Sequence, residues 1–246
     1  MTSPPRLRII GPGRAGGSLA AALGRSGWEV AEPLGRADDA SRALHDVDLL
    51  VVATPDAVLA EVAGTVEPSD TAVIAHLAGS LGLEVLAPHR RVAALHPLVS
   101  LPEADIGARR LASGAWFAVA GDPIVQRAVA DLGGRWFQVA DEDRASYHAA
   151  AVVASNHLVA LLGQVERIAA GIDVPFEAYL DLARATLDNV ATLGPAAALT
   201  GPAARGDWDT IARHLAALAP AETDAYRALA DAARRLVDDS GLPPDL

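Results

Sequence analysis

The sequence predicts an α/β domain built on a doubly wound parallel sheet, followed by an all-α helical domain. Up to residue 140, short apolar runs alternate with helix-like segments, which is typical of a parallel sheet covered by helices on both faces. A glycine-rich turn joins the first apolar run to the first helix-like segment. From residue 141 onward, long amphipathic segments are separated by prolines. We therefore expect one domain over residues 1–140 and a second over residues 141–246.

The first strand and helix are joined by the pattern G-x-G-x-x-G. The apolar run 7–10 leads directly into Gly11, Gly13 and Gly16, and helical spacing follows. In a dinucleotide-binding unit, the first glycine permits the tight turn and the second lets the pyrophosphate approach the backbone. The third lets the helix lie close against the strand, and the N–H groups at the helix start face the phosphates. The loop residues expected to hold a dinucleotide are Gly11, Pro12, Gly13, Arg14, Ala15 and Gly16.

The segment after the first helix bears on the choice between NAD and NADP. Residues 28–31 are expected to form the second strand. An acidic residue about twenty positions beyond the last glycine holds the ribose 2′-hydroxyl of NAD. Arg36 occupies that position here and would pair with the 2′-phosphate of NADP. NADP(H) is therefore favoured, but Glu32 would be the acid in another register, which keeps NAD(H) open, and Arg36 could also be a solvated loop charge.

The remaining apolar runs complete the expected sheet. Residues 48–56 form a continuous apolar run closed by a proline, as in a central strand covered on both faces. Further strands are expected at residues 71–77, 92–95, 116–120 and 136–139, with helices at 57–63 and 125–132.

Polar residues follow the ends of three of these strands. Ligands of open α/β sheets bind beyond the carboxyl ends of the strands, so these positions are candidate site residues. Thr54, Pro55 and His76 are expected to contact the cofactor. Ser80 and His96 are expected to approach the reacting end of a substrate, although each histidine could instead be half-buried and bonded to the backbone.

Composition excludes several kinds of chemistry. The 246 residues contain no cysteine, and all twenty basic residues are arginine, so cysteine nucleophiles, Schiff bases and lysine acids are excluded. The net charge of −11 argues against a nucleic-acid partner. No uninterrupted apolar run has the length of a membrane span, and the first residues lack the apolar core of a signal peptide. No metal site is expected. A cytoplasmic protein is the natural interpretation.

The expected second domain contains four helices, at residues 141–170, 174–193, 208–218 and 222–239, with Asp141 as the expected cap of the first. His148 lies among alanines on that long helix, where a core position would more often carry a bulky side chain, so we assign it a functional role. On an ideal helix Ser155 lies about 20° around from His148, whereas Asn156 is displaced by about 80° and roughly 12 Å along the axis. His157 is expected to be structural.

A shaped loop between two of the helices offers polar groups. The stretch 199–207 contains Thr200 and Arg205, which provide a hydroxyl and a guanidinium suited to a carboxylate or phosphate. Asp207 is expected to cap the helix that follows. A connecting loop in which Arg205 pairs with Asp207 is an equally good interpretation.

Taken together, these motifs resemble a bacterial family of Rossmann-like proteins with a helical C-terminal domain of unknown function. The resemblance covers nearly the whole chain. It rests on the glycine pattern, the 52–56 strand end, His76 to Ser80, His96-Pro97, His148 to Asn156, and the T-G-P-x-x-R-G-D stretch at 200–207. Members are often described as related to deazaflavin-dependent NADP reductases. More distantly, the chain resembles the 6-phosphogluconate dehydrogenase superfamily, and its Gly-Ser and His-Pro motifs resemble prephenate dehydrogenases.

That resemblance implies a two-domain NADP(H) oxidoreductase that dimerises through its helical domain, with a small keto or imino acid such as ketopantoate bound in the interdomain cleft. His148 would be the general acid, and Asn156, Thr200 and Arg205 would hold the substrate carboxylate. The related reductases that carry a lysine on the first helix of the second domain cannot share their mechanism with this lysine-free chain. The alternatives are a non-catalytic NADP sensor or partner-binding module, and a prephenate dehydrogenase-like enzyme that depends on His96.

Overall fold

The computed structural model describes residues 3–240 and divides into two compact units, residues 1–155 and 156–246. The division falls between Ser155 and Asn156, inside the helical stretch that follows residue 140, and not at residue 140 itself. The first helical turns of this stretch therefore pack with the sheet. Each unit is described separately below.

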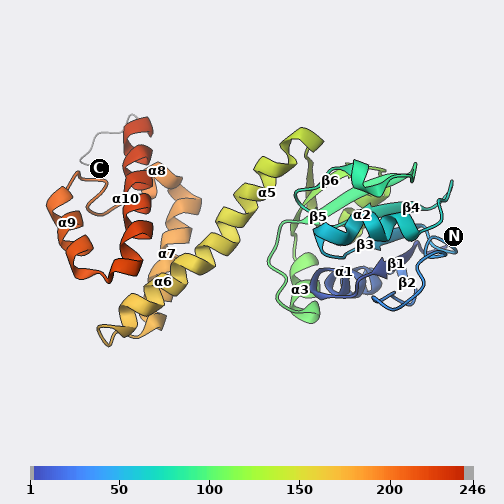
Figure 1. The fold of residues 1–246 in the computed structure, drawn as a ribbon, viewed down its shortest axis with the longest axis horizontal. Helices are drawn as coiled ribbons and strands as arrows, with labels where there is room; N and C mark the ends of the chain where they lie inside the picture. The colour runs from blue at the N-terminus through green and yellow to red at the C-terminus, as the bar shows by residue number, and fades with distance from the viewer. Residues whose placement is uncertain (1–2, 241–246) are drawn as a thin grey trace. The chain divides into compact units, whose positions relative to one another are not determined.

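The first unit is built on a seven-stranded sheet of order β2-β1-β3-β4-β5-β6-β7 (Figure 1). Its strands are β1 Arg6–Ile10, β2 Glu29–Val30, β3 Leu49–Val52, β4 Val73–His76, β5 Val92–Pro97, β6 Trp116–Gly121 and β7 Arg135–Gln138. Strands β1 to β5 are parallel, as expected, so their carboxyl ends lie along one edge. Strand β6 runs antiparallel to β5, with His96 opposite Ala118, and β7 is parallel to β6. The α/β fold class is confirmed, but the sheet is mostly and not wholly parallel.

Helices cover both faces of this sheet (Figure 1). They are α1 Arg14–Arg25, α2 Asp56–Thr65, α3 Ala104–Leu111 and α4 Ile124–Asp131, with a 3₁₀ turn at Leu83–Leu86. Helices α1, α3 and α4 pack on one face, while α2 and the 3₁₀ turn pack on the other. The sequence of β3 is continuously apolar because both of its faces are buried. Leu49 and Val51 belong to one core, and Leu50 and Val52 belong to the other. Burying each of these side chains stabilises the fold by roughly 1.5–3 kcal/mol.

The helical part of the chain begins with a 3₁₀ turn at Asp141–Asp143, which leads into α5 Arg144–Val152, a π-helical turn at Val153–His157 and α6 Leu158–Ala170. The helices that follow are α7 Phe176–Leu193, α8 Pro195–Ala198, α9 Trp208–Ala217 and α10 Pro220–Ser240. As expected, Asp207 caps α9, because its carboxylate accepts the Thr210 N–H at 3.0 Å. The four long helices predicted from the sequence are therefore present.

The stretch Asp141–Ala170 is long and apolar enough to cross a membrane by length and composition alone, with a mean hydropathy of 1.3 in one 18-residue window. Within the described part of the chain it is the one helix that meets these criteria. This stretch is not an uninterrupted apolar run, because many alanines are interspersed with polar residues. A single helix of this kind is weak evidence for a membrane span.

Candidate functional site

The glycine loop between β1 and α1 has the geometry that its sequence predicts. Gly11 has a positive φ of 86°, and a Cβ there would lie 2.9 Å from the Ala53 carbonyl oxygen. A Cβ on Gly16 would overlap the Gly11 carbonyl oxygen and lie 2.9 Å from the Ile9 side chain, so this glycine lets α1 lie against the strands. At Gly13 a Cβ would meet nothing within 4 Å. The space over Gly13 is therefore open to a ligand.

The start of α1 offers unpaired donors beside this space. Its N-cap is Gly13, which has no side chain to satisfy the first N–H groups, and its first turn contains no acidic residue. Such a helix start attracts an anion through its N–H groups and its dipole. The expected loop residues, from Gly11 to Gly16, thus form a cradle suited to a pyrophosphate.

Two neighbouring segments complete this cradle. Thr54 follows β3, and its hydroxyl oxygen is buried with no hydrogen-bond partner among residues 3–240. The Gly11 N–H donates to the Leu34 carbonyl oxygen at 2.8 Å, which ties the segment after β2 to the glycine loop. Arg36 is two residues further on and is exposed, as a ligand of a nucleotide phosphate would need to be. In the same loop, the Asp38 carboxylate accepts the Gly35 N–H at 2.7 Å.

Near the carboxyl end of β5, the structure brings His96 and His148 together. The two imidazole rings meet edge to face with centroids 5.9 Å apart. Both lie against Gly79, where a Cβ would be 2.7 Å from His148 Cδ2 and 2.9 Å from His96 Nε2. A residue with a side chain at Gly79 would therefore displace the imidazoles.

Tyr147, which the sequence interpretation did not single out, holds His96 in place. Its hydroxyl oxygen lies 2.6 Å from His96 Nδ1, and the two rings are 5.4 Å apart. A signal was present in the sequence, because Tyr147 is adjacent to His148 and both side chains lie on the first helix after the sheet.

The protonation states in this cluster follow from burial. Burial, reinforced by His148 and Arg144, lowers the pKa of His96 to about 4. Burial also raises the pKa of Tyr147 to about 12, against the opposing charge of Arg144. At neutral pH His96 is therefore neutral and Tyr147 protonated. When the hydroxyl donates to His96 Nδ1, the imidazole hydrogen is on Nε2, the nitrogen next to Gly79.

His76, expected to be a cofactor ligand, is fully buried at the end of β4. Its Nδ1 accepts the Ala78 N–H at 3.1 Å, which is the backbone-bonded interpretation that the sequence left open. Burial, with a further contribution from Arg144, lowers its pKa to about 4, so the ring is neutral at neutral pH. Since Nδ1 is an acceptor, the hydrogen of the neutral ring is on Nε2, which is buried and has only a weak interaction with the Gly82 backbone among the described residues.

Ser80 is held by an acidic residue from another element. Its hydroxyl donates to the Asp56 carboxylate at 3.1 Å, and Asp56 begins α2 next to Pro55. Ser80 is thus fixed between the expected cofactor contacts at 54–55 and the histidines.

Arg144 is the most unusual residue of the first unit, and the sequence interpretation missed it. Its side chain is 0% exposed, and its Nε donates to the Asp141 carboxylate at 3.1 Å. The other carboxylate oxygen of Asp141 accepts the Leu83 N–H at 3.2 Å. The expectation that Asp141 caps its own helix is therefore wrong, because its carboxylate is used to anchor Arg144 and the loop before the 3₁₀ turn. The i, i+3 spacing of the two residues was the available signal.

The helical geometry assumed between His148 and Asn156 is also wrong. Residues 153–157 form a π-helical turn, so angles counted at a constant α-helical step do not apply across it. Ser155 donates to the Ala151 carbonyl oxygen at 2.7 Å. Asn156 begins the second unit, where Thr200 and Arg205 also lie.

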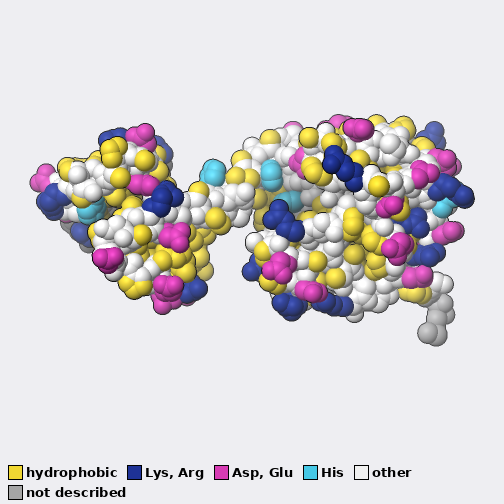
Figure 2. Space-filling view, turned by 60° about the horizontal axis from the view of Figure 1, so that its bottom comes forward, with side chains coloured by type: hydrophobic (Ala, Val, Ile, Leu, Met, Phe, Trp, Pro, Cys, Tyr) yellow, Lys and Arg dark blue, Asp and Glu magenta, His cyan; other side chains and the backbone are white. Residues whose placement is uncertain are grey.

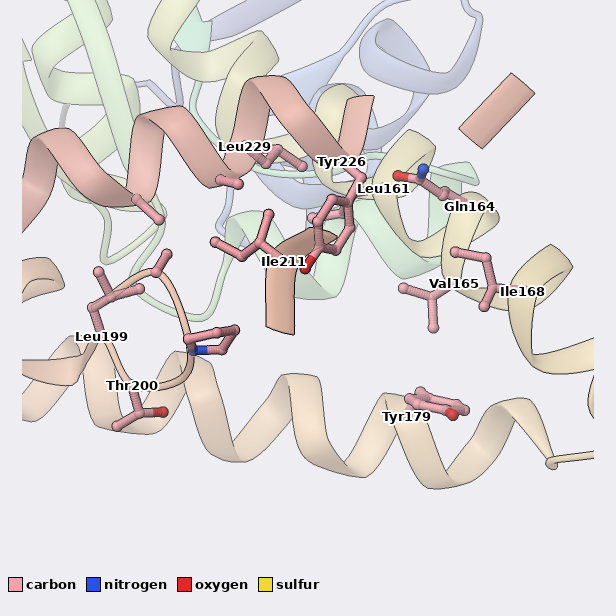
Figure 3. A pocket seen from close by; sticks show the side chains of 14 residues that line it. Leu161, Gln164, Val165, Ile168, Tyr179, Leu199, Thr200, Ile211, Tyr226 and Leu229 are labelled. Atoms are coloured by element: carbon pink, nitrogen blue, oxygen red, sulfur yellow. The ribbon is translucent and has the colours of Figure 1, made fainter. Parts of the chain in front are cut away.

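The second unit contains an apolar cavity of about 410 Å³ (Figure 3). Thr200 lines it, together with side chains from α6, α7, α9 and α10. Arg205 is exposed and is not among the lining residues, and no charged side chain of the described chain lines the cavity. Two of its four polar side chains are already engaged: Gln164 donates to the Glu222 carbonyl oxygen at 2.8 Å, and the Tyr226 hydroxyl lies 2.6 Å from His214 Nδ1. This cavity does not suit a carboxylate.

Comparison with known proteins agrees with this architecture. Residues 117–233 match the family model described as Domain of unknown function (DUF2520). No curated protein matched the chain by sequence.

Several solved structures share the fold over almost the whole chain. The NADP oxidoreductase candidate BF3122 from Bacteroides fragilis is 22% identical, with a TM-score of 0.77 and coverage of 95% of this chain and 99% of that one. Protein TM1727 from Thermotoga maritima is 25% identical, with a TM-score of 0.73 and the same coverage. A reductive aminase from Aspergillus terreus is 15% identical, with a TM-score of 0.69 and coverage of 97% and 100%. The chain is thus a Rossmann-fold protein with a helical C-terminal region, of which residues 117–233 match DUF2520.

Proposed function

We propose that this protein is an NADP(H)-dependent oxidoreductase that transfers hydride to or from a small keto or imino acid. The observation that carries the proposal is the placement of two sets of groups along one edge of the sheet. The glycine loop follows β1, and the histidines lie at the carboxyl ends of β4 and β5. These ends are at the same edge of the sheet as the end of β1, because the strands are parallel.

The glycine loop fits the dinucleotide, because the space over Gly13 is open and the Thr54 hydroxyl lacks a partner among the described residues. Gly11 to Gly16 would hold the pyrophosphate, and Arg36 the 2′-phosphate. Asp38 in the same loop keeps NAD(H) as the alternative cofactor, since a carboxylate there suits a ribose hydroxyl. Among the related structures, BF3122 is described as an NADP oxidoreductase candidate, and the reductive aminase was solved with NADPH4, cyclohexanone and allyl amine.

The histidine cluster supplies the groups that act on the substrate. A bound NADPH supplies the hydride, and bound NADP accepts it in the reverse direction. His148 gives a proton to the developing alkoxide or amine, and the Nε2–H of neutral His96 donates a hydrogen bond to the same oxygen or nitrogen. Tyr147 is the positioning residue, because its hydroxyl fixes the orientation of His96.

Ligand-induced thermal stabilisation tests the cofactor assignment. NADPH, NADH and a reduced deazaflavin are compared, alone and with a panel of keto acids that includes ketopantoate. At about a hundred times its dissociation constant, a ligand adds roughly 2.7 kcal/mol to the free energy of unfolding. We expect the largest increase in melting temperature with NADPH. An unchanged melting temperature with all three would contradict the proposal.

Replacing Arg36 with glutamine should weaken NADPH binding by about tenfold to a hundredfold and leave NADH binding unchanged. The reason is that a hydrogen bond to a charged group contributes about 1.5–3 kcal/mol, and only NADPH carries the 2′-phosphate. Arg127→Gln, at an exposed ion pair on α4, is the matched control. If Arg36→Gln lowers both affinities equally, Arg36 does not read the 2′-phosphate.

We also propose that the protein is soluble and cytoplasmic, and that it forms a homodimer through the helical unit. Figure 2 shows hydrophobic side chains at the surface of this unit. Val159, Leu182 and Leu187 on α6 and α7 are 70%, 62% and 54% exposed. A second copy would cover them.

Sedimentation velocity without detergent tests the dimer. We expect the wild type to sediment as a dimer and the double variant Leu182→Glu, Leu187→Glu as a monomer, since two carboxylates would be buried at the interface. Leu98→Glu, at a 40% exposed site of the first unit, should leave the dimer intact. A monomeric wild type would exclude this assembly.

A further inference from the structure

The buried guanidinium of Arg144 has more donors than the surrounding protein satisfies. One nitrogen, Nε, donates to Asp141, whose carboxylate is itself 46% exposed and shared with the Leu83 N–H. Both terminal nitrogens, Nη1 and Nη2, are buried and have no hydrogen-bond partner among residues 3–240. Leaving donors of a buried charge unpaired is costly, so a fold that keeps them indicates a missing acceptor.

A second buried donor accompanies Arg144. The Nε2–H of His76 makes no well-formed hydrogen bond in the described chain, and the interaction of this imidazole with the Gly82 backbone is too weak to offset the effect of burial on its pKa. The two groups are close enough that the charge of Arg144 helps to lower the pKa of His76. Together they present only donors, and an ionised carboxylate is a group that only accepts hydrogen bonds.

The surrounding charges favour a carboxylate over a phosphate. Arg144 is paired with Asp141, and His76 and His96 are neutral at neutral pH. Because the charges of Arg144 and Asp141 already cancel, a monoanion adds one buried negative charge and a phosphate dianion adds two, so a carboxylate is the less costly of the two occupants. The planar fork of a guanidinium also matches the two oxygens of a carboxylate.

We propose that Arg144 and His76 form a buried carboxylate-binding site for an organic acid. This deepens the proposed function and rests on it for the identity of the occupant: the carboxylate is that of the keto or imino acid, held beside His96 and His148. On this proposal the substrate carboxylate binds neither Thr200 nor Arg205. Thr200 lines the apolar cavity of the second unit, and Arg205 is not among the residues that line it.

Binding of pyruvate to the full-length protein tests this site. Ligand-observed NMR and thermal stabilisation are measured without nucleotide and again with NADPH, with methyl pyruvate as the uncharged analogue and inorganic phosphate as the dianion. We expect saturable binding of pyruvate and none of methyl pyruvate. Arg144→Gln should weaken pyruvate binding by about tenfold or more. Arg127→Gln, the same substitution at an exposed arginine of α4, should leave it unchanged.

Arg144→Gln could lose pyruvate binding only because it folds poorly. A second variant that is expected to bind pyruvate more tightly than wild type separates binding from folding. Asp141→Asn removes the competing negative charge and keeps one oxygen that can accept from Arg144, while the hydrogen bond from the Leu83 N–H to the second oxygen is lost. Pyruvate should therefore bind several-fold more tightly to Asp141→Asn than to wild type.

Three results would overturn the carboxylate site. The first is no pyruvate binding with or without NADPH, which is the result expected if water fills the site. The others are equal pyruvate binding by wild type and Arg144→Gln, and binding of phosphate in place of pyruvate. Each leaves the NADPH assignment standing, because that assignment is measured by the nucleotide alone. Conversely, Arg144-dependent pyruvate binding without stabilisation by any nucleotide would retain the site and reject the oxidoreductase.

Discussion

Replacing Gly13 with alanine should lower the affinity for NADPH by about tenfold or more, which corresponds to about 1.4 kcal/mol of binding free energy. A Cβ at this position meets no protein atom within 4 Å and would occupy the space proposed for the pyrophosphate. Gly13 has an extended backbone with φ of −74°, which alanine adopts without strain. The free energy of unfolding should therefore change by less than about 1 kcal/mol, the typical difference between good and poor N-caps. Calorimetric titration and chemical denaturation give the two quantities.

The same substitution at Gly16 should have the opposite outcome for stability. Alanine in a helix interior ordinarily gains about 1 kcal/mol over glycine. Here the new Cβ would overlap the Gly11 carbonyl oxygen and press on Ile9 and Ala53. Because backbone and core atoms cannot move aside as a flexible side chain does, the cost of overpacking, about 1–3 kcal/mol or more, outweighs the gain.

Gly64 provides the matched control for both glycines. It lies in α2, it is exposed, and a Cβ there meets nothing within 4 Å. Gly64→Ala should stabilise the protein slightly, by up to about 1 kcal/mol, and leave NADPH binding unchanged. If Gly13→Ala bound NADPH as tightly as Gly64→Ala does, the glycine loop would not be the dinucleotide site.

The loop and the parallel strands could be predicted because local physics determines them. A Cβ at Gly11 or Gly16 would clash with neighbouring backbone, and the spacing of the glycines is enough to predict this. Strand β3 is apolar throughout because its residues face two cores. The direction of β6 could not be predicted in this way. Apolar runs indicate that a strand exists, whereas its direction depends on how the segment after β5 returns to the sheet.

Helix α3 was missed although its sequence carries a signal. Asp105 lies in its first turn and Arg109 and Arg110 in its last, which is the charge order that the helix dipole favours. Its Gly107 lies so close to Ser18 of α1 that a Cβ would overlap the serine hydroxyl. The glycine obscured the helical pattern, but it is needed there for the close packing of α1 and α3.

Arg144 shows the limit of sequence reasoning for the site. It ends a run of charged residues, Asp141 to Arg144, that is typical of a solvated helix start. Only the fold shows that its side chain is fully buried and that the loop after β4 meets Asp141. The sequence predicts His96 from its place at a strand end and His148 from its alanine neighbours, but their meeting at Gly79 follows from tertiary structure.

Replacing His148 with glutamine should lower the rate of substrate reduction by about 10²–10⁴-fold, the usual contribution of a positioned general acid. The measurement is single-turnover consumption of NADPH with the keto or imino acid that gives the largest thermal stabilisation. His157→Gln is the matched control, because this histidine is exposed in the π-helical turn and belongs to the second unit. NADPH affinity should be unchanged in both variants, since neither residue is placed in the cofactor cradle.

His96→Gln separates the proposed enzyme from its two alternatives. In a prephenate dehydrogenase-like oxidation, His96 would be the base, so its loss would abolish turnover while His148→Gln remained active. Burial holds the pKa of His96 at about 4, so His96 would stay neutral and able to act as a base until the pH falls to about 4. In that case kcat/KM for oxidation would be constant above this pH. In the proposed reduction, the loss of His148 is the more damaging, and His96→Gln removes only the hydrogen bond from Nε2. If NADPH binds but no member of the panel accepts hydride even from the wild type, the chain is a sensor of NADP(H), and the imidazoles at Gly79 do not act as acids or bases.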